Sequence, residues 1–365
     1  MACMENIDPL MIRGEHLSEE EKQQIADTYA AAGKDAVYEA VSTKKILPFA
    51  AKTLCACGID ADFWSEIADT YRRRNESILR FLDKAYRALA ECGVQKMFVS
   101  ENFGALLLSG GDLSLFASGD VDNYADPAEK EKIYAAFEAI GCTRKERFAG
   151  QHQIAAEFFP NKEENLPEKF YISVDFYPLA RLKLPCFVRA DDFVDWDKLT
   201  VYPGTAVKLP PASALMYICL CHISLHSFSR APDIRLYMDL LNLCKTDTDY
   251  HRIAQWSRRD ATCCRVAVAA TIANRLMKTN FPSEITELSK RKQRVLRMVY
   301  DFQKNDLRYE PHGLNVLRIE VNCDDRGALH GLFSILFPDP KWMKRVYGSS
   351  GLAAHLKHMK GAIGA

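Results

Sequence analysis

The sequence predicts an α+β fold in which a small mixed β-sheet is flanked by N-terminal and C-terminal helical regions. Apolar residues recur at helical spacing through residues 18–91 and again after Pro210, whereas residues 170–177 alternate apolar and polar side chains as a half-buried strand does. Between these parts, short strand-like and helix-like segments follow one another. The predicted regions are an N-terminal helical region at residues 1–93, an α/β core at 94–205 and a C-terminal helical domain at 206–365.

The N-terminal region begins with a recognisable helix signal. Ser18 and Glu21 have the spacing of a capping box, in which the two side chains bond each other's backbone amides. A second helix is expected over residues 42–57. A longer one is expected to end near Gly93, where a C-terminal cap belongs.

The core region is expected to run strand, helix, strand, helix, strand, strand. Residues 94–100 are predicted as a buried strand and residues 102–108 as a short helical or irregular piece. Gly110 and Gly111 predict a turn into the next strand. The other expected elements are a helix from Asp126 and Pro127 to Gly141, strands at 148–159 and 170–177, and helices at 212–228, 233–244, 250–277 and 284–304, with 310–323 as strand or helix.

The most informative residues are two aspartates at i and i+2 on a predicted strand. Asp120 and Asp122 share one face of that strand, and two carboxylates so close repel each other unless a cation or a proton shares the site. Asp175, on the polar face of a later strand, is the expected third carboxylate, with Glu157 a weaker candidate. Three converging carboxylates suit a two-metal site for phosphoryl or nucleotidyl transfer, whereas the pair alone is more typical of a solvated turn.

Composition limits the partners and the compartment. With 48 basic and 48 acidic residues, the chain has no overall attraction for nucleic acid or membranes, although residues 290–297 are basic and form either a solvated helix face or an anion-binding surface. The 12 cysteines are scattered and the start has no signal peptide, which favours a reducing cytoplasm. No apolar run reaches the roughly 18 residues that span a bilayer, so a soluble protein without membrane contact is expected.

Several motifs together resemble a known family. They are Leu-Ala-Glu-Cys-Gly-Val at 89–94, Gly-Asp-Val-Asp at 119–122, Ile-Ser-Val-Asp-Phe-Tyr at 172–177, the segment 222–226 followed by 233–240, and Leu-Phe-Pro-Asp-Pro at 336–340. The chain resembles the polymerase-β-like nucleotidyltransferase superfamily, and more closely an uncharacterised bacterial nucleotidyltransferase-like family, nearly end to end.

The resemblance implies an enzyme that moves a nucleoside monophosphate from a nucleoside triphosphate to a hydroxyl of a small-molecule, sugar or protein acceptor. It implies that Asp120 and Asp122 bind Mg²⁺ (or Mn²⁺) and that Asp175 completes a second metal site or activates the acceptor. The family's first strand usually ends in a Lys-Gly pair near the phosphates. Ser100 and Glu101 stand there in this chain, which removes a cation and a glycine.

Further candidates lie beside the carboxylates. Gly110 and Gly111, or Ser100, are expected near the nucleotide, together with Gly119 before the Asp pair, and the two alignments stay open. The candidates to line a cleft for the substrates are His152, His222, His226 and Asp239. The alternatives are a buried polar network between helices and, for His152, a purely structural role.

Two other functions compete with the transferase. A catalytically degenerate nucleotidyltransferase fold that serves as a binding or interaction module is favoured by Ser100 and Glu101. Action on the end of an RNA is suggested by the basic residues 290–297, but the balanced net charge argues against nucleic acid.

Overall fold

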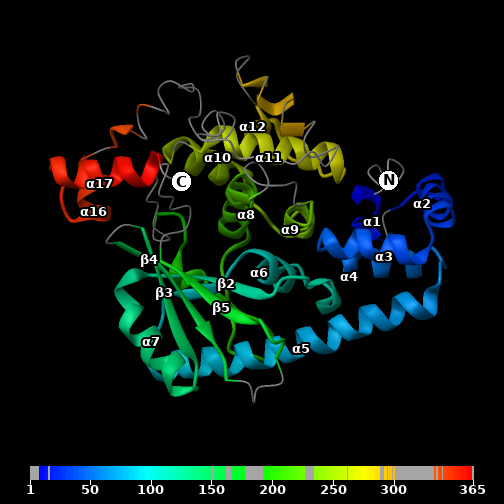
Figure 1. Ribbon diagram of the computed structural model, residues 1–365, viewed down its shortest axis with the longest axis horizontal. Coiled ribbons are helices and arrows are strands. Elements are labelled where there is room, and N and C mark those ends of the chain that lie inside the picture. Colours follow the sequence, from blue (N-terminus) through cyan, green and yellow to red (C-terminus); the bar gives the residue numbers. More distant parts are fainter. Residues whose placement is uncertain are drawn as a thin grey trace.

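A computed structural model of the chain shows the predicted α+β fold. A mixed sheet of five strands lies between the long helix α5, which runs beneath it, and a layer of helices above (Figure 1). The structure describes residues 8–14, 17–149, 152–161, 166–176, 192–226, 234–260, 262–287, 292–293, 295–297, 299–300, 333, 336–338 and 340–363.

The strand order of the main sheet is β1-β2-β5-β4-β3, and only β2 and β5 are parallel to each other. In that parallel pair, Asp120 lies opposite Tyr171 and Asp122 lies opposite Ser173. The strands are β1 (Met97–Val99), β2 (Asp120–Ala125), β3 (Thr143–Ala149), β4 (His152–Phe159) and β5 (Tyr171–Asp175), and a separate small sheet pairs β6 (Thr200–Val201) with β7 (Lys208–Leu209).

The prediction of one strand over residues 148–159 is wrong at its start. Phe148 and Ala149 end β3, and β4 begins only at His152, antiparallel to it. The strand β3 has the sequence Thr-Arg-Lys-Glu-Arg-Phe-Ala and forms the edge of the sheet. Charged side chains are typical of edge strands, and they remove the apolar alternation by which a strand is recognised in a sequence.

The helices before the sheet follow the predicted order. The capping box is present, because the Ser18 amide donates to Glu21 Oε2 at 2.9 Å and the Glu21 amide donates to Ser18 Oγ at 3.3 Å. The long helix ends as predicted, with Gly93 in the left-handed region at φ 73°. The helices are α1 (Asp8–Met11), α2 (Glu19–Ala32), α3 (Lys34–Thr43), α4 (Leu47–Ala56) and α5 (Ala61–Glu91), so the predicted helix at 42–57 begins later, at Leu47.

Within the core, α6 (Glu101–Leu108) follows β1, and α7 (Lys130–Ala139) follows β2. The described residues of this part of the chain include the short 3₁₀ helices η2 (Leu113–Leu115), η3 (Pro127–Glu129) and η6 (Trp196–Lys198). Asp126 caps η3 as expected, because its carboxylate accepts the Ala128 amide at 3.0 Å.

After the sheet the chain is again mainly helical. The helix expected over residues 250–277 is two helices, because Asp260 and Thr262 both bond the Tyr217 hydroxyl at 2.9 Å and hold the break between them. The described helices are α8 (Ala212–His226), α9 (Leu236–Leu243), α10 (Tyr250–Arg259), α11 (Cys263–Leu276), α12 (Ser283–Thr286), α16 (Pro340–Tyr347) and α17 (Leu352–Ile363). Residues 310–323 lie outside the described part of the chain.

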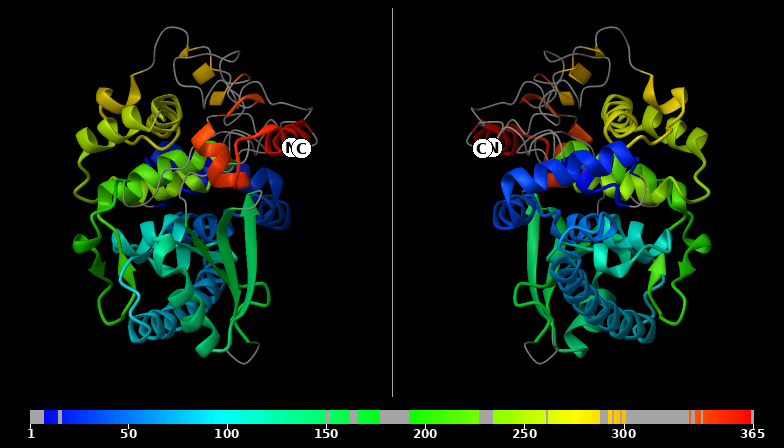
Figure 2. Two further views of the ribbon diagram at one scale, coloured as in Figure 1. Left: turned by 90° about the vertical axis from the view of Figure 1, so that its left-hand side faces the viewer. Right: turned by 90° about the vertical axis from the view of Figure 1, so that its right-hand side faces the viewer.

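Two hydrophobic cores position the sheet. One core packs the lower face of the sheet on α5 and α7, through residues such as Leu82, Val121 and Phe137. The other joins the N-terminal and C-terminal helices into one layer and reaches the upper face of the sheet at Phe98 and Tyr124. Figure 2 shows this helical layer above the sheet from both sides. None of the described helices is long and apolar enough to cross a membrane.

Candidate active site

Asp120 and Asp122 lie on the upper face of the sheet, as the strand spacing predicts. Val121, between them, points into the lower core and is fully buried. Two hydroxyls orient the Asp120 carboxylate: Ser118 Oγ donates to Oδ1 at 2.5 Å, and the Tyr171 hydroxyl donates to Oδ2 at 2.8 Å. Asp120 therefore has a fixed orientation at the start of β2.

Asp175 lies on the same face, one strand away. Because β2 and β5 are parallel, with Asp122 opposite Ser173, Asp175 is the diagonal neighbour of Asp122 across the pair. Burial, followed by the negative charges of Glu101, Asp120 and Asp175, raises the pKa of Asp122 well above its ordinary value. Burial also raises the pKa of Asp175 to about 7, although the nearby Arg147 guanidinium lowers it in part. The three predicted acids therefore form one crowded group.

A fourth carboxylate, Glu101, joins the three predicted ones. Its Oε1 accepts the Tyr124 hydroxyl at 2.6 Å and lies 2.7 Å from His222 Nδ1. The negative charge of this side chain is the second cause of the raised pKa of Asp122. Sequence reasoning treated Glu101 only as a departure from the family's Lys-Gly pair. Its contacts come from β2 and α8, which no local pattern could reveal.

Basic residues on the edge strand β3 border the acidic group. Arg147 Nη2 is 3.5 Å from Asp175 Oδ1, and Arg147 Nε is 3.3 Å from Glu157 Oε1. Lys145 Nζ is 3.6 Å from the other oxygen of Glu157. The Arg147 side chain is 46% exposed, so its guanidinium also faces solvent beside the carboxylates. Arg147 was not predicted, because the strand that contains it was not.

The predicted nucleotide-binding positions are not equally close to the carboxylates. The Ser100 amide donates to the Asp122 carbonyl at 2.8 Å, and Gly119 directly precedes Asp120. Gly110 and Gly111 instead follow the other end of α6, whose eight residues separate them from Ser100 by about 12 Å. The structure thus brings Ser100 and Gly119 to the acids, and Gly110 and Gly111 lie apart from them.

The turn at Ser100 and Glu101 has two unusual features. Glu101 has φ 49°, in the left-handed region that glycine adopts without strain. The Ser100 hydroxyl is fully buried and has no hydrogen-bond partner in the described part of the chain. A buried hydroxyl without a partner is costly, and it is explained most simply by a ligand or water that bonds it in the working protein.

Of the four cleft candidates, the structure describes two side chains. His222 contacts Glu101, as above, and its positive charge when protonated lowers the pKa of Asp175. Asp239 is buried and lines a space of about 20 Å³ together with Ser118, which is room for little more than one water molecule. His152 and His226 belong by their backbones to β4 and α8, but their side chains lie outside the described residues.

The acidic group fits a divalent cation in its chemistry. Carboxylate oxygens are the ligands that Mg²⁺ and Mn²⁺ prefer, and a cation would neutralise the negative charges that, after burial, raise the pKa of Asp122. In the described part of the chain, no three acidic, histidine or cysteine side chains are arranged as a metal site. Asp120 instead accepts the hydroxyls of Ser118 and Tyr171, and Asp175 Oδ1 lies 3.5 Å from Arg147 Nη2.

No protein-family model matches this sequence, and comparison with curated proteins and with solved structures finds no significant similarity.

Proposed function

We propose that this protein is a cytoplasmic, divalent-cation-dependent nucleotidyltransferase. It would move a nucleoside monophosphate from a nucleoside triphosphate to a hydroxyl of a small-molecule, sugar or protein acceptor. The observation that supports this most strongly is the crowding of Asp120, Asp122 and Asp175 on one face of two parallel strands. Carboxylates are seldom buried together without a cation or a shared proton, because their like charges repel.

Asp120, Asp122 and Asp175 are the residues that would hold Mg²⁺ or Mn²⁺. When bound, the cation supplies positive charge where the phosphates and the leaving pyrophosphate become more negative. The hydroxyls of Ser118 and Tyr171 donate to the two oxygens of the Asp120 carboxylate at 2.5 and 2.8 Å, so a bound cation would share these oxygens with the two hydroxyls.

Asp175 has the pKa of a general base that works near neutral pH. Without a cation, burial raises this pKa to about 7. A bound cation would lower it, so Asp175 would accept the proton of an acceptor hydroxyl only where it does not itself hold the cation. Arg147 Nη2 lies 3.5 Å from Asp175 Oδ1, and its guanidinium is partly exposed. This cation would bind the phosphates in place of the family's lysine, which this chain lacks.

The test is release of pyrophosphate from each nucleoside triphosphate with Mg²⁺ or Mn²⁺, in the presence of sugar, nucleoside and peptide acceptors. Asp120→Asn is expected to abolish release and to leave the fold intact. Asp69→Asn, an exposed aspartate on α5, is the matched control and is expected to retain the activity. Equal activity of the native protein and Asp120→Asn would refute the proposal.

A second candidate is a catalytically degenerate fold that binds a ligand or a partner. Glu101 favours this second candidate, because it occupies the turn after β1 and its carboxylate adds negative charge beside Asp122. If Glu101 repels the phosphates, Glu101→Gly is expected to create nucleotide binding that the native protein lacks. Metal-dependent nucleotide binding by the native protein would contradict this second candidate.

A further inference from the structure

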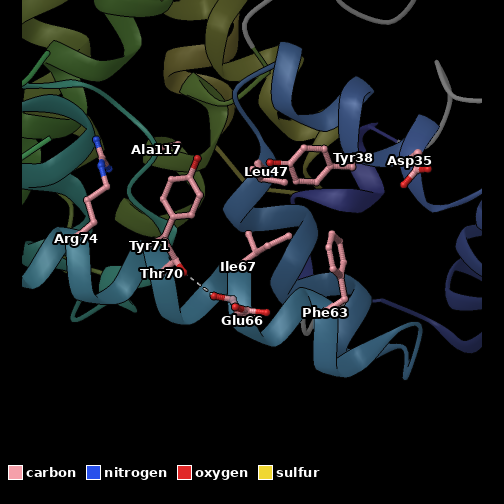
Figure 3. A pocket seen from close by; sticks show the side chains of 10 residues that line it. All are labelled: Asp35, Tyr38, Leu47, Phe63, Glu66, Ile67, Thr70, Tyr71, Arg74 and Ala117. Carbon is pink, nitrogen blue, oxygen red and sulfur yellow. Dashed lines mark hydrogen bonds between the residues drawn. The ribbon is translucent and has the colours of Figure 1, made fainter. Parts of the chain in front are cut away.

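A second potential ligand site lies away from the carboxylates, where the N-terminal half of α5 meets α3 and α4. It is a pocket of about 740 Å³, within the usual size of small-molecule sites. Its lining residues are Asp35, Tyr38, Leu47, Phe63, Glu66, Ile67, Thr70, Tyr71, Arg74 and Ala117 (Figure 3).

Three aromatic rings line this pocket. Phe63 and Tyr71 rise from α5, and Tyr38 extends from α3 toward them (Figure 3). The rings of Tyr38 and Phe63 meet edge to face, with centroids 6.1 Å apart and planes at 63°, so they form a corner of two differently oriented ring surfaces. Tyr38 is 41% exposed even though it is large and aromatic. Packing within the chain leaves this ring surface available.

The carboxylates of Asp35 and Glu66 lie at the rim of the pocket. Among the described residues, no basic side chain forms an ion pair with the carboxylate of Asp35 or of Glu66. Arg74 is the one cation in the lining, and its guanidinium donates inward, to Asn75 Oδ1 at 2.8 Å and to the Phe116 and Ser118 carbonyls at 3.3 and 2.5 Å. The charge of Arg74 is thus directed to the backbone beside β2 and away from the acidic rim.

The aromatic surfaces here already attract a cation from the chain. Lys34 Nζ lies 4.8 Å from the centre of the Phe63 ring, at the distance of a cation–π contact. Ring faces and carboxylates both favour a positive charge, and a flat apolar group would cover the rings.

We propose that this pocket binds a small organic cation with a flat ring, such as an aryl amidine. The flat ring stacks on Tyr38 with its edge toward Phe63, and the positive end lies toward Glu66. This proposal is independent of the transferase proposal, because none of the lining residues belongs to the acidic group on the sheet.

The experiment uses the full chain and the probe 4-aminobenzamidine, titrated by ligand-observed NMR, with neutral 4-aminobenzamide as the matched ligand. Saturable binding of the amidine and much weaker binding of the amide are expected. Tyr38→Ala and Glu66→Gln are each expected to weaken amidine binding about two- to fivefold, as the loss of one exposed cation–π or ionic contact does. Glu91→Gln, an exposed acid at the other end of α5, is the control and is expected to bind as the native protein does.

Three results would overturn the proposal. The first is no saturable binding of the amidine at millimolar concentration. The second is equal affinity for the amidine and the amide, which would mean that the charge is not recognised. The third is binding that survives Tyr38→Ala and Glu66→Gln but is lost in Asp120→Asn, which would place the cation at the sheet carboxylates.

Discussion

Asp175→Asn is expected to make the protein more stable at pH 8 and to change its stability little at pH 4. Burial is the main reason that the pKa of Asp175 rises from 3.8 to about 7 on folding. A carboxyl whose pKa is raised in the native state holds its proton more tightly there than in the unfolded chain. Its contribution to stability is therefore complete below pH 3.8 and is lost as the pH rises through about 7. Asparagine has no charge at either pH and avoids this loss.

The size of the effect follows from the same values. A rise from 3.8 to about 7 is about 3 pKa units, and at about 1.4 kcal/mol per unit the upper limit is about 4 kcal/mol. The Asp175 side chain is 24% exposed, so solvent screens part of this cost, and the variant also loses the 3.5 Å contact with Arg147. The expected gain of Asp175→Asn at pH 8 is therefore about 2 kcal/mol.

The assay is urea unfolding of the native protein and the variant at pH 4, 6 and 8. The difference between the two free energies of unfolding cancels the titration of groups that do not interact with Asp175, and it should grow with pH. The exposed Asp69→Asn is the control and should show no such growth. A variant that is less stable than the native protein at pH 8, or a difference that does not change with pH, would refute the conclusion that burial raises the pKa of Asp175.

Two further predictions concern the packing that positions the acids, and urea unfolding measures both. Gly104→Ala is expected to destabilise the protein by about 2–3 kcal/mol, because a Cβ there would lie 2.6 Å from the Val99 carbonyl oxygen. Gly119→Ala should be nearly neutral, because a Cβ at that position would have no atom within 4 Å. Equal effects of the two would contradict the close contact of α6 with β1. Asn123→Ala is expected to cost about 3 kcal/mol, since Asn123 Oδ1 accepts the buried Tyr86 hydroxyl at 2.8 Å. Combining it with Tyr86→Phe should cost less than the sum of the two single changes, and full additivity would show that the bond contributes nothing.

The local parts of the fold were predictable from the sequence. The capping box at Ser18 and Glu21 and the end of α5 at Gly93 depend on neighbouring residues alone, and the structure confirms both. The placement of Asp120 and Asp122 on one face follows from strand geometry in the same way.

The remaining features of the site depend on contacts between distant segments. Asp175 lies beside Asp122 only because β2 and β5 pair in parallel, and alternation within a strand does not specify its partner. Glu101 is held beside the aspartates by contacts with Tyr124 and His222, which belong to other elements. Arg147 was not predicted, because four of the seven residues of its strand are charged and the strand shows no apolar alternation.

The central claim is that Asp120, Asp122 and Asp175 together form a cation-dependent nucleotide site. Its most direct test is calorimetric titration of the native protein and Asp122→Asn with each nucleoside triphosphate, with Mg²⁺ and with the chelator EDTA. Saturable binding of at least one triphosphate by the native protein is predicted, lost both on chelation and in Asp122→Asn. Binding that persists unchanged in EDTA and in the variant, or no binding of any triphosphate by folded native protein, would contradict the claim.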